Sequence, residues 1–274
     1  MITLPWVPIA VALYYIVRAP APDEVVRFAL YRPSDAMFFL DQGASPGDSV
    51  DYPRSAIDTV AFGAKGDVGL ACSQRSRENG RGFRTFVDGR WFMSGLPARP
   101  ATGDLALGQP GDLPYCADFD GDGIADSGVF RDGQWSIATG RTGEGAAIRF
   151  VFGSANDLPV VLNVEGAGNA TDRKGVVYGV YRQGKWILDT NGSGAVGATH
   201  SFGGLPQDLP LLIPRWSRNP TPGPQYSLAI FRDGTWYIKP EPEGTETITF
   251  RFGQAGDLPG FVRQRRQEQA RGGH

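Results

Sequence analysis

The stretch Val129-Phe130-Arg131-Asp132-Gly133-Gln134-Trp135-Ser136-Ile137 predicts two short β-strands joined by a tight turn. The first run ends in an aromatic residue and an arginine, and the second alternates polar and apolar residues. Asp-Gly between two such runs indicates a hairpin, because a two-residue turn of the primed type needs positive φ angles. Alternation places Trp135 and Ile137 on one face, as expected for a half-buried strand.

Similar hairpins recur along the chain. Their central dipeptides are Asp88-Gly89, Asp132-Gly133, Gln183-Gly184 and Asp233-Gly234. A second signature, an aromatic-Gly followed by Gly-Asp-Leu-Pro or a variant of it, divides the chain into five units. Its aspartates are Asp67, Asp112, Asp157, Asp208 and Asp257, at spacings of 45, 45, 51 and 49 residues. Periods of about 20–50 residues are typical of solenoids, propellers and arrays.

Each unit contains four predicted strands, and the third usually carries a tryptophan. A single four-stranded sheet cannot bury both of its faces, whereas sheets arranged around an axis can. We therefore predict an all-β fold, a β-propeller of about five four-stranded blades in one domain over residues 23–262. The chain ends with an extra first strand at 257–262, which would complete the blade that begins at 25–30. Closure of this kind would remove exposed strand edges.

The apolar segment at residues 1–22 has two interpretations, and the sequence leaves both open. Val7 to Val11 aligns with Leu209 to Ile213, as the first strand of blade one. Alternatively, residues 1–22 are an export signal or a membrane anchor, although no basic region precedes the apolar run and its length is short for a spanning helix. Residues 263–274 are predicted to be a polar, disordered tail.

One loop, Asp118-Phe119-Asp120-Gly121-Asp122-Gly123-Ile124-Ala125-Asp126, offers an oxygen at every second position. The candidate ligands are the side chains of Asp118, Asp120, Asp122 and Asp126 and the backbone carbonyl of Ile124. A hard cation that takes six to eight oxygens at about 2.3–2.6 Å suits this set, and calcium suits it better than magnesium. The loop is not an EF-hand, because Val129 stands where the twelfth-position Glu is required. The alternative is an acidic turn without metal, in which the carboxylates would repel one another.

These motifs together resemble the FG-GAP or VCBS-type repeat, which builds bacterial extracellular propellers and the head of integrin α chains. The resemblance covers about residues 23–262 and implies a string of calcium sites. Only the loop at 118–126 keeps the full pattern. The corresponding segments beginning at Ser73, Asn163 and Arg215 are basic, longer or interrupted by proline. We therefore predict one calcium site.

The remaining candidate residues have competing structural interpretations. The five repeated aspartates are predicted to bond to their own backbone two residues on, within the turn. The strand-end arginines Arg32, Arg131, Arg182 and Arg232 are predicted to pair with those aspartates rather than to form a ring for an anionic ligand. Cys72 and Cys116 can form one disulfide, but we favour two small core residues. Trp216 is either an exposed binding residue, for sugar or protein, or packs against its own blade.

Composition narrows the classes of function. The chain has 274 residues and a net charge of −2, which gives no reason to expect nucleic acid as a partner. No catalytic constellation is recognisable, so we predict a protein that is not an enzyme. The leading hypothesis is an exported, calcium-binding module for protein binding, adhesion or assembly that is secreted, periplasmic or on the cell surface. It would display variable loops at 73–82, 163–175 and 214–225. The alternative is a carbohydrate-binding propeller, and membrane association is expected only if residues 1–22 are an anchor.

Overall fold

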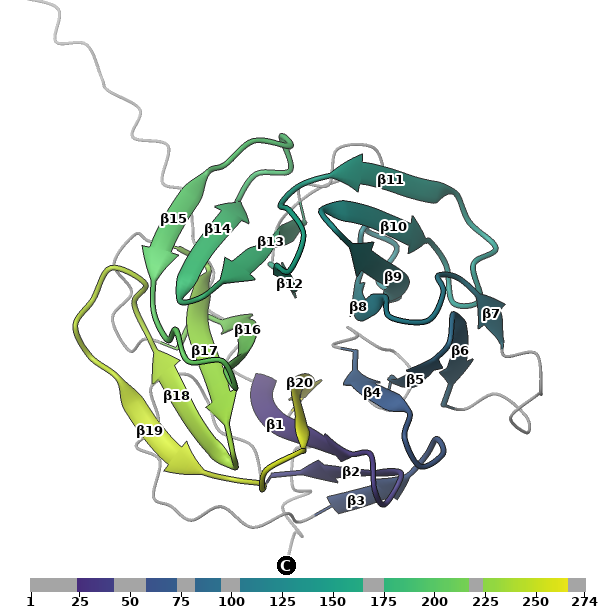
Figure 1. The fold of residues 1–274 in the computed structure, drawn as a ribbon, viewed down its shortest axis with the longest axis horizontal. Coiled ribbons are helices and arrows are strands. Elements are labelled where there is room, and N and C mark those ends of the chain that lie inside the picture. The colour runs from purple at the N-terminus through teal and green to yellow at the C-terminus, as the bar shows by residue number, and fades with distance from the viewer. Residues whose placement is uncertain are drawn as a thin grey trace, which may run out of the picture.

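The computed structural model describes residues 24–41, 58–72, 82–94, 104–164, 175–216 and 224–265. Within these ranges the chain forms strands and turns without any helix. The strands make five four-stranded antiparallel sheets arranged around an axis, as Figure 1 shows. The predicted all-β, five-bladed propeller is confirmed.

Each blade has its first strand near the axis and its fourth strand at the rim (Figure 1). Blade 1 contains β20 (Leu258–Arg265), β1 (Glu24–Arg32), β2 (Met37–Leu40) and β3 (Asp58–Ala61). Blade 2 contains β4 (Val68–Ala71), β5 (Phe83–Val87), β6 (Arg90–Met93) and β7 (Leu105–Ala106). Blade 3 contains β8 (Leu113–Ala117), β9 (Asp126–Arg131), β10 (Gln134–Ala138) and β11 (Ala147–Val151). Blade 4 contains β12 (Leu158–Asn163), β13 (Val176–Arg182), β14 (Lys185–Asp189) and β15 (Ala198–Ser201). Blade 5 contains β16 (Leu209–Pro214), β17 (Tyr226–Arg232), β18 (Thr235–Lys239) and β19 (Ile248–Arg251).

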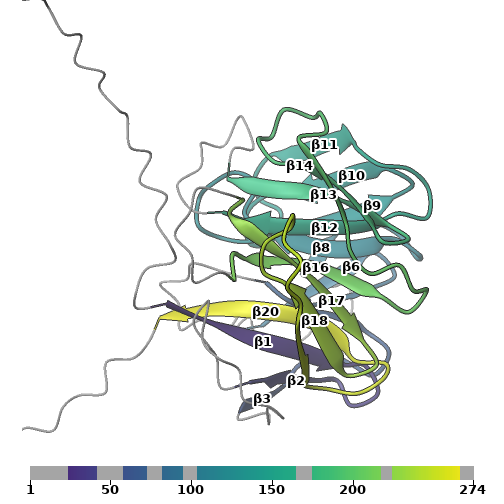
Figure 2. The same cartoon turned by 90° about the vertical axis from the view of Figure 1, so that its left-hand side faces the viewer.

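Blade 1 is built from both ends of the described chain. β20 pairs antiparallel with β1, from Leu258 opposite Tyr31 to Arg265 opposite Glu24, and the two strands lie side by side in Figure 2. The predicted closure by a C-terminal strand is confirmed, and β20 continues three residues beyond the predicted boundary at 262. The competing placement of Val7 to Val11 lies outside the described residues, while β20 occupies the innermost place of that blade.

No helix in the described part of the chain is long and apolar enough to cross a membrane. The segment for which we expect a signal, an anchor or a strand, residues 1–22, lies outside that part, as do residues 266–274 of the predicted tail.

The predicted Asp-Gly hairpins are present in blades 2, 3 and 5, with Gln-Gly in blade 4. In blade 3, for example, Arg131 pairs with Gln134 across a two-residue turn. Asp132 and Gly133 have φ angles of 51° and 85°. Positive φ at both central residues is what a type I′ turn requires, and Gly and Asp tolerate it best.

The repeated tryptophans and the aromatic-Gly signature form one structural unit. The indole N–H of Trp135 donates to the carbonyl of Phe152 at 2.8 Å, and the Phe152 N–H donates to the carbonyl of Gly133 at 2.8 Å. The same indole bond recurs in the other tryptophan-containing blades: Trp91 to Leu107, Trp186 to Phe202 and Trp236 to Phe252. All four indole rings are fully buried, so in blades 2 to 5 the tryptophan fixes the end of the fourth strand while filling the core.

The repeated aspartates are structural, as predicted, but their backbone partner differs from the predicted one. Each accepts an N–H from the residue three positions earlier, as Asp157 does from Ser154 at 2.8 Å. Four of them also pair with the predicted arginines. The pairs are Arg32–Asp257, Arg131–Asp112, Arg182–Asp157 and Arg232–Asp208. Each pair joins the start of a first strand to the end of the second strand in the same blade.

Trp216 is 1% exposed, so its interpretation as an exposed binding residue is wrong. Its ring lies 5.4 Å from that of Phe28 in blade 1, and Phe28 also contacts Trp236 at 4.7 Å. Trp216 therefore packs into the seam between blades 5 and 1, because an aromatic ring at this position completes the apolar contact between neighbouring sheets.

Candidate metal site

The acidic loop 118–126 closes the hairpin between β8 and β9 in blade 3. Ala117, the last residue of β8, lies opposite Asp126, the first residue of β9. Asp118 follows Ala117 directly, so the antiparallel pairing brings the first and last aspartates of the loop to the same end of the hairpin. The site is therefore positioned by strand register, which the repeated blade architecture fixes.

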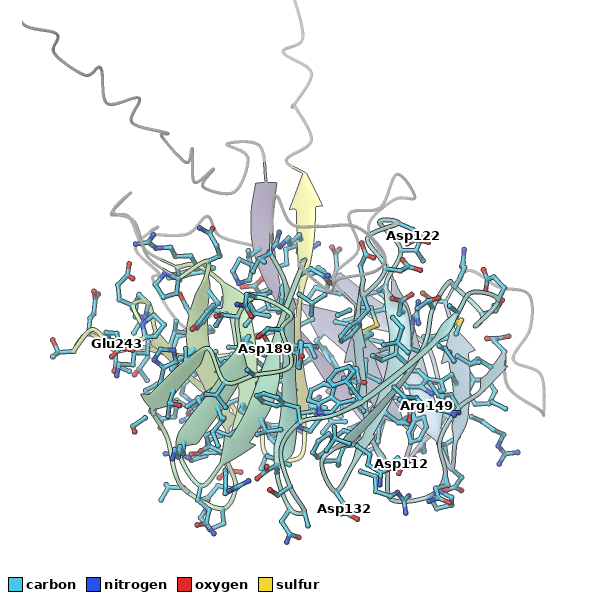
Figure 3. All side chains as sticks on the ribbon, turned by 90° about the horizontal axis from the view of Figure 1, so that it is seen from above. Asp112, Asp122, Asp132, Arg149, Asp189 and Glu243 are labelled. Atoms are coloured by element: carbon cyan, nitrogen blue, oxygen red, sulfur yellow. A yellow bond between two sulfur atoms is a disulfide. The ribbon has the colours of Figure 1, made fainter. Side chains whose placement is uncertain are left out.

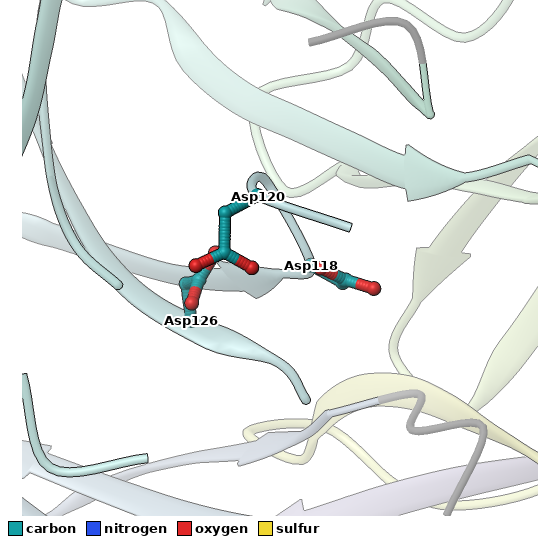
Figure 4. Close-up of side chains that lie close together, drawn as sticks. All are labelled: Asp118, Asp120 and Asp126. Atoms are coloured by element: carbon teal, nitrogen blue, oxygen red, sulfur yellow. The ribbon is translucent and has the colours of Figure 1, made fainter. Parts of the chain in front are cut away.

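Three of the predicted ligands converge. One carboxylate oxygen from each of Asp118, Asp120 and Asp126 lies within 4.8 Å of the others, and Figure 4 shows the three side chains close together. Asp122 is not in this group. It is exposed at the outer end of the loop (Figure 3), and its carboxylate accepts the Ile124 N–H at 2.7 Å.

The loop backbone wraps around the carboxylate of Asp118. Its two oxygens accept the N–H groups of Gly121 at 2.6 Å and Gly123 at 2.9 Å. Both glycines have positive φ angles, of 80° and 88°, a conformation that other residues adopt at a cost. The two glycines therefore let the loop turn tightly enough to surround one carboxylate.

Asp126 is the deepest of the three carboxylates and is fully buried. Its oxygens accept N–H groups from Phe119 at 2.7 Å and Gly140 at 2.9 Å. Burial, together with the charges of Asp120 and Asp118, raises the pKa of Asp126 to about 7, although the two backbone bonds oppose the shift. Burial also raises the pKa of Asp118. A bound cation would favour the ionised form of both groups.

Neighbouring blades hold the loop from both sides. Asn163 at the end of β12 accepts the Asp118 N–H at 3.0 Å and donates to the Asp118 carbonyl at 2.8 Å. On the other side Arg84 of β5, which is 2% exposed, donates to Ser127 Oγ and to the carbonyl of Ala125. Burial lowers the pKa of Arg84 to about 10, against the opposing charge of Asp126.

The carboxylate oxygens of this loop are ligands of the type that calcium prefers. Three carboxylates supply hard oxygen donors, and calcium takes six to eight such ligands in flexible geometry. Asp122 and the Ile124 carbonyl stand in the same loop as further candidates, although the structure does not group Asp122 with the other three. Asp118, Asp120 and Asp126 are thus the residues around which a cation would bind.

A second loop, Asp189 to Ala195 in blade 4, repeats part of this hydrogen-bond pattern with a single carboxylate. Asp189 accepts N–H groups from Asn191 at 3.0 Å and Gly192 at 2.8 Å, and also the Tyr178 hydroxyl at 2.6 Å. Hydrogen bonds to the ionised carboxylate, that of Tyr178 first, lower the pKa of Asp189 despite its burial. Backbone N–H groups and the Tyr178 hydroxyl satisfy the Asp189 carboxylate, so this loop geometry is not a sign of a cation. Asp189 lies apart from Asp122 in Figure 3.

Cys72 and Cys116 form a disulfide, with their Cα atoms 5.7 Å apart. The sequence-based preference for two unpaired core residues is therefore wrong. The spacing of the two cysteines relative to the repeat could have predicted this disulfide. The two cysteines are 44 residues apart, close to the 45 that separate Asp67 from Asp112, so they hold near-equivalent places in neighbouring blades. Equivalent places on adjacent innermost strands lie side by side.

Asn163 and Arg84 could not be recognised from the sequence, because their role depends on which blades are neighbours. Most of the variable loops predicted at 73–82, 163–175 and 214–225 lies outside the described residues.

Comparisons with known proteins give no family. No protein-family model matches the sequence, and no curated protein matches it. Among solved structures, Sqt1 of Chaetomium thermophilum, bound to the N-terminus of ribosomal protein L10, aligns with a TM-score of 0.41 and 11% identity. The alignment covers 87% of this chain and 61% of that one, so this chain spans less than two thirds of Sqt1. The strand pairing within the structure itself establishes the propeller.

Proposed function

We propose that this protein is an exported, calcium-binding propeller of the FG-GAP or VCBS type, which serves as a non-enzymatic module for protein binding or assembly. The observation that carries the calcium assignment is the convergence of Asp118, Asp120 and Asp126 in one hairpin loop. Calcium would neutralise these charges and fix the loop relative to the strands that hold it.

Export is supported by the Cys72–Cys116 disulfide. Structural disulfides persist in oxidising compartments such as the periplasm and the extracellular space, and are rare in the cytosol. Calcium is also abundant outside the cell, where a site of modest affinity is occupied. Both features favour a secreted, periplasmic or surface location.

A binding role suits the rigid ring better than catalysis does. His200 is the one histidine among the described residues. Its Nδ1 lies 2.6 Å from a Glu243 carboxylate oxygen and its Nε2 lies 2.9 Å from the Tyr226 hydroxyl. Both ring nitrogens are engaged in a bridge between blades 4 and 5, and His200 is 7% exposed, which favours a structural role for this residue. The burial of Trp216 removes the exposed aromatic residue that would have marked a binding site for sugar or protein.

The calcium assignment is tested by thermal unfolding with calcium or with a chelator, on the native chain and on Asp120→Ala. Calcium at 100 times its dissociation constant should stabilise the native chain by about 2.7 kcal/mol, because only the folded state binds it. Asp120→Ala should lose most of this gain. If calcium leaves the melting temperature of the native chain unchanged, the loop is an acidic turn and the assignment fails.

Two matched variants sharpen this test. Glu246→Gln removes an exposed carboxylate on blade 5 and should keep the full calcium response. Asp122→Ala removes a predicted ligand that lies outside the convergent group. A smaller loss in Asp122→Ala than in Asp120→Ala would agree with the structure, whereas an equal loss would place Asp122 among the ligands.

Protein binding is tested by site-specific photocrosslinking on the cells that produce the protein. A photoreactive residue at position 124, at the end of the ring where the acidic loop joins the first and second strands of blade 3, should give a calcium-dependent adduct with one protein. The same residue at position 151 on the rim should not, although Val151 is more exposed, at 72% against 38% for Ile124. Equal labelling from both positions would contradict a binding face at this end.

A further inference from the structure

We infer that two links from blade 2, the Cys72–Cys116 disulfide and the Arg84 guanidinium, position the candidate calcium site, so that loss of either link weakens calcium binding. The inference rests on the proposed calcium site and adds residues that lie outside the acidic loop.

The disulfide joins the base of the hairpin that carries the carboxylates. Cys116 lies in β8, two residues before Asp118. In the strand register Cys116 is opposite Ser127, the neighbour of Asp126. A displacement of Cys116 would therefore move both ends of the ligand set, since Asp118 and Asp126 leave the hairpin at this point.

The other half of the disulfide is fixed in blade 2. Cys72 follows β4 and is 1% exposed, and its N–H donates to the carbonyl of Gly82 at 2.9 Å. Arg84 stands two residues after Gly82 in β5 and reaches Ala125 and Ser127, which flank Asp126. A covalent bond and a buried guanidinium thus run from one place in blade 2 to the same hairpin base in blade 3.

Apolar packing contributes little to this seam. In the described residues, the core cluster of blade 2 formed by Phe86, Trp91 and Met93 includes one residue of blade 3, Val129. On the opposite side of the loop, Phe119 packs within a larger cluster that contains Tyr178 of blade 4. The blade 2 side of the hairpin base is therefore held mainly by the disulfide and Arg84, while Arg141, next to Gly140, also donates to the carbonyl of Ser94 in blade 2 at 2.9 Å.

A preorganised site binds a cation more tightly than one that must first be ordered. If the hairpin base moves freely, calcium binding must also bring Asp118, Asp120 and Asp126 together. The coupling between two such events is typically about 5–150-fold in affinity, and it is reciprocal. We expect calcium to bind at least about fivefold more weakly without the disulfide.

The experiment is calorimetric titration of calcium chloride into the oxidised native chain and into the double variant Cys72→Ser/Cys116→Ser. The control is Ile238→Val, which removes a buried methyl group in blade 5 and should lower stability without changing the calcium dissociation constant. This control separates positioning of the site from general loss of stability. Near-ultraviolet circular dichroism establishes that each variant is folded.

A dissociation constant at least about fivefold higher in the double variant, with Ile238→Val unchanged, supports the inference. The same dissociation constant in the native chain and the double variant overturns it and leaves the calcium assignment intact. If the native chain does not bind calcium, the proposed site fails, and the inference falls with it.

Ser127→Ala decides the question if the double variant does not fold. It keeps the disulfide and removes one of the two oxygen acceptors of Arg84. Weaker calcium binding by Ser127→Ala than by Ile238→Val supports a positioning role for the links from blade 2. Equal binding by the two variants overturns it.

Discussion

At the scale of single residues, Asp126 and Asp208 are both buried, but their pKa values shift in opposite directions because their partners differ. Asp126 lies beside other carboxylates, and burial raises its pKa to about 7. Asp208 is 2% exposed, and burial alone would raise its pKa too. Hydrogen bonds from the Leu205 N–H, the Arg232 guanidinium and the Tyr181 hydroxyl instead lower the pKa of Asp208 below its usual 3.8. Hydrogen-bond donors, the Arg232 guanidinium among them, thus outweigh burial at Asp208, whereas burial prevails at Asp126.

The lowered pKa of Asp208 predicts how the stability of the fold depends on pH. The folded state favours the ionised form, so its contribution is complete above about pH 3.8 and is lost as pH falls through the lower folded pKa. Asp208→Asn should therefore cost about 1–3 kcal/mol at pH 7, and the difference from the native chain should shrink below pH 3.8. Urea unfolding at pH 7 and pH 3 measures this. A constant difference at both pH values would show that the ionised form is not favoured.

At the scale of elements, the hairpin turn packs against the aromatic-Gly turn of the same blade because the hairpin carries a glycine at the point of contact. A Cβ atom built on Gly133 would lie 2.6 Å from the carbonyl oxygen of Gly153. The two turns are 20 residues apart in the sequence, so the contact joins the second and third strands of the blade to its fourth. The Asp-Gly and aromatic-Gly signatures recur together because the two turns pack against each other.

We predict that Gly133→Ala destabilises the protein by about 1–3 kcal/mol more than Gly111→Ala does. Both glycines have a φ of 85°, so both variants carry the same backbone cost. Nothing lies within 4 Å of a Cβ at Gly111, and the difference therefore isolates the collision with Gly153. Thermal unfolding of the two variants measures it. Equal losses of stability in the two variants would mean that the close approach of Gly133 to the Gly153 carbonyl does not make Gly133→Ala more destabilising.

At the scale of the whole molecule, the ring depends on a strand from the end of the chain. β20 supplies the innermost strand of blade 1, and it buries Phe261 and Val262, which are 8% and 3% exposed. Arg32 and Asp257 add an ion pair within the same blade at 2.7 Å. Without β20, blade 1 would present an unpaired strand edge toward the axis.

Deletion of residues 258–274 should therefore cost at least about 5 kcal/mol, which is comparable to the whole stability of many domains. We expect loss of cooperative unfolding and of the near-ultraviolet circular dichroism signal. Deletion of residues 266–274 leaves β20 complete and serves as the control, with a native melting temperature expected. A native melting temperature for the longer deletion as well would show that the ring does not need β20.

The sequence by itself determined the fold class and the number of blades, because these follow from local patterns repeated at a fixed period. It offered the closing strand as one of two candidates, and the structure places β20 beside β1. Asp-Gly between Arg131 and Gln134 sets a turn, and alternation around Trp135 sets a buried face, whatever lies elsewhere in the chain. The pairing of the repeated aspartates with strand-end arginines was also predictable, since both belong to one blade.

Only the tertiary structure decided which residues of different blades meet. The burial of Trp216 against Phe28 and the support of the acidic loop by Arg84 and Asn163 both cross from one blade to another. It also separated Asp122 from the three convergent carboxylates. A repeat fixes the contacts within each unit, but contacts between units depend on the rotation between blades about the axis, which no local pattern encodes.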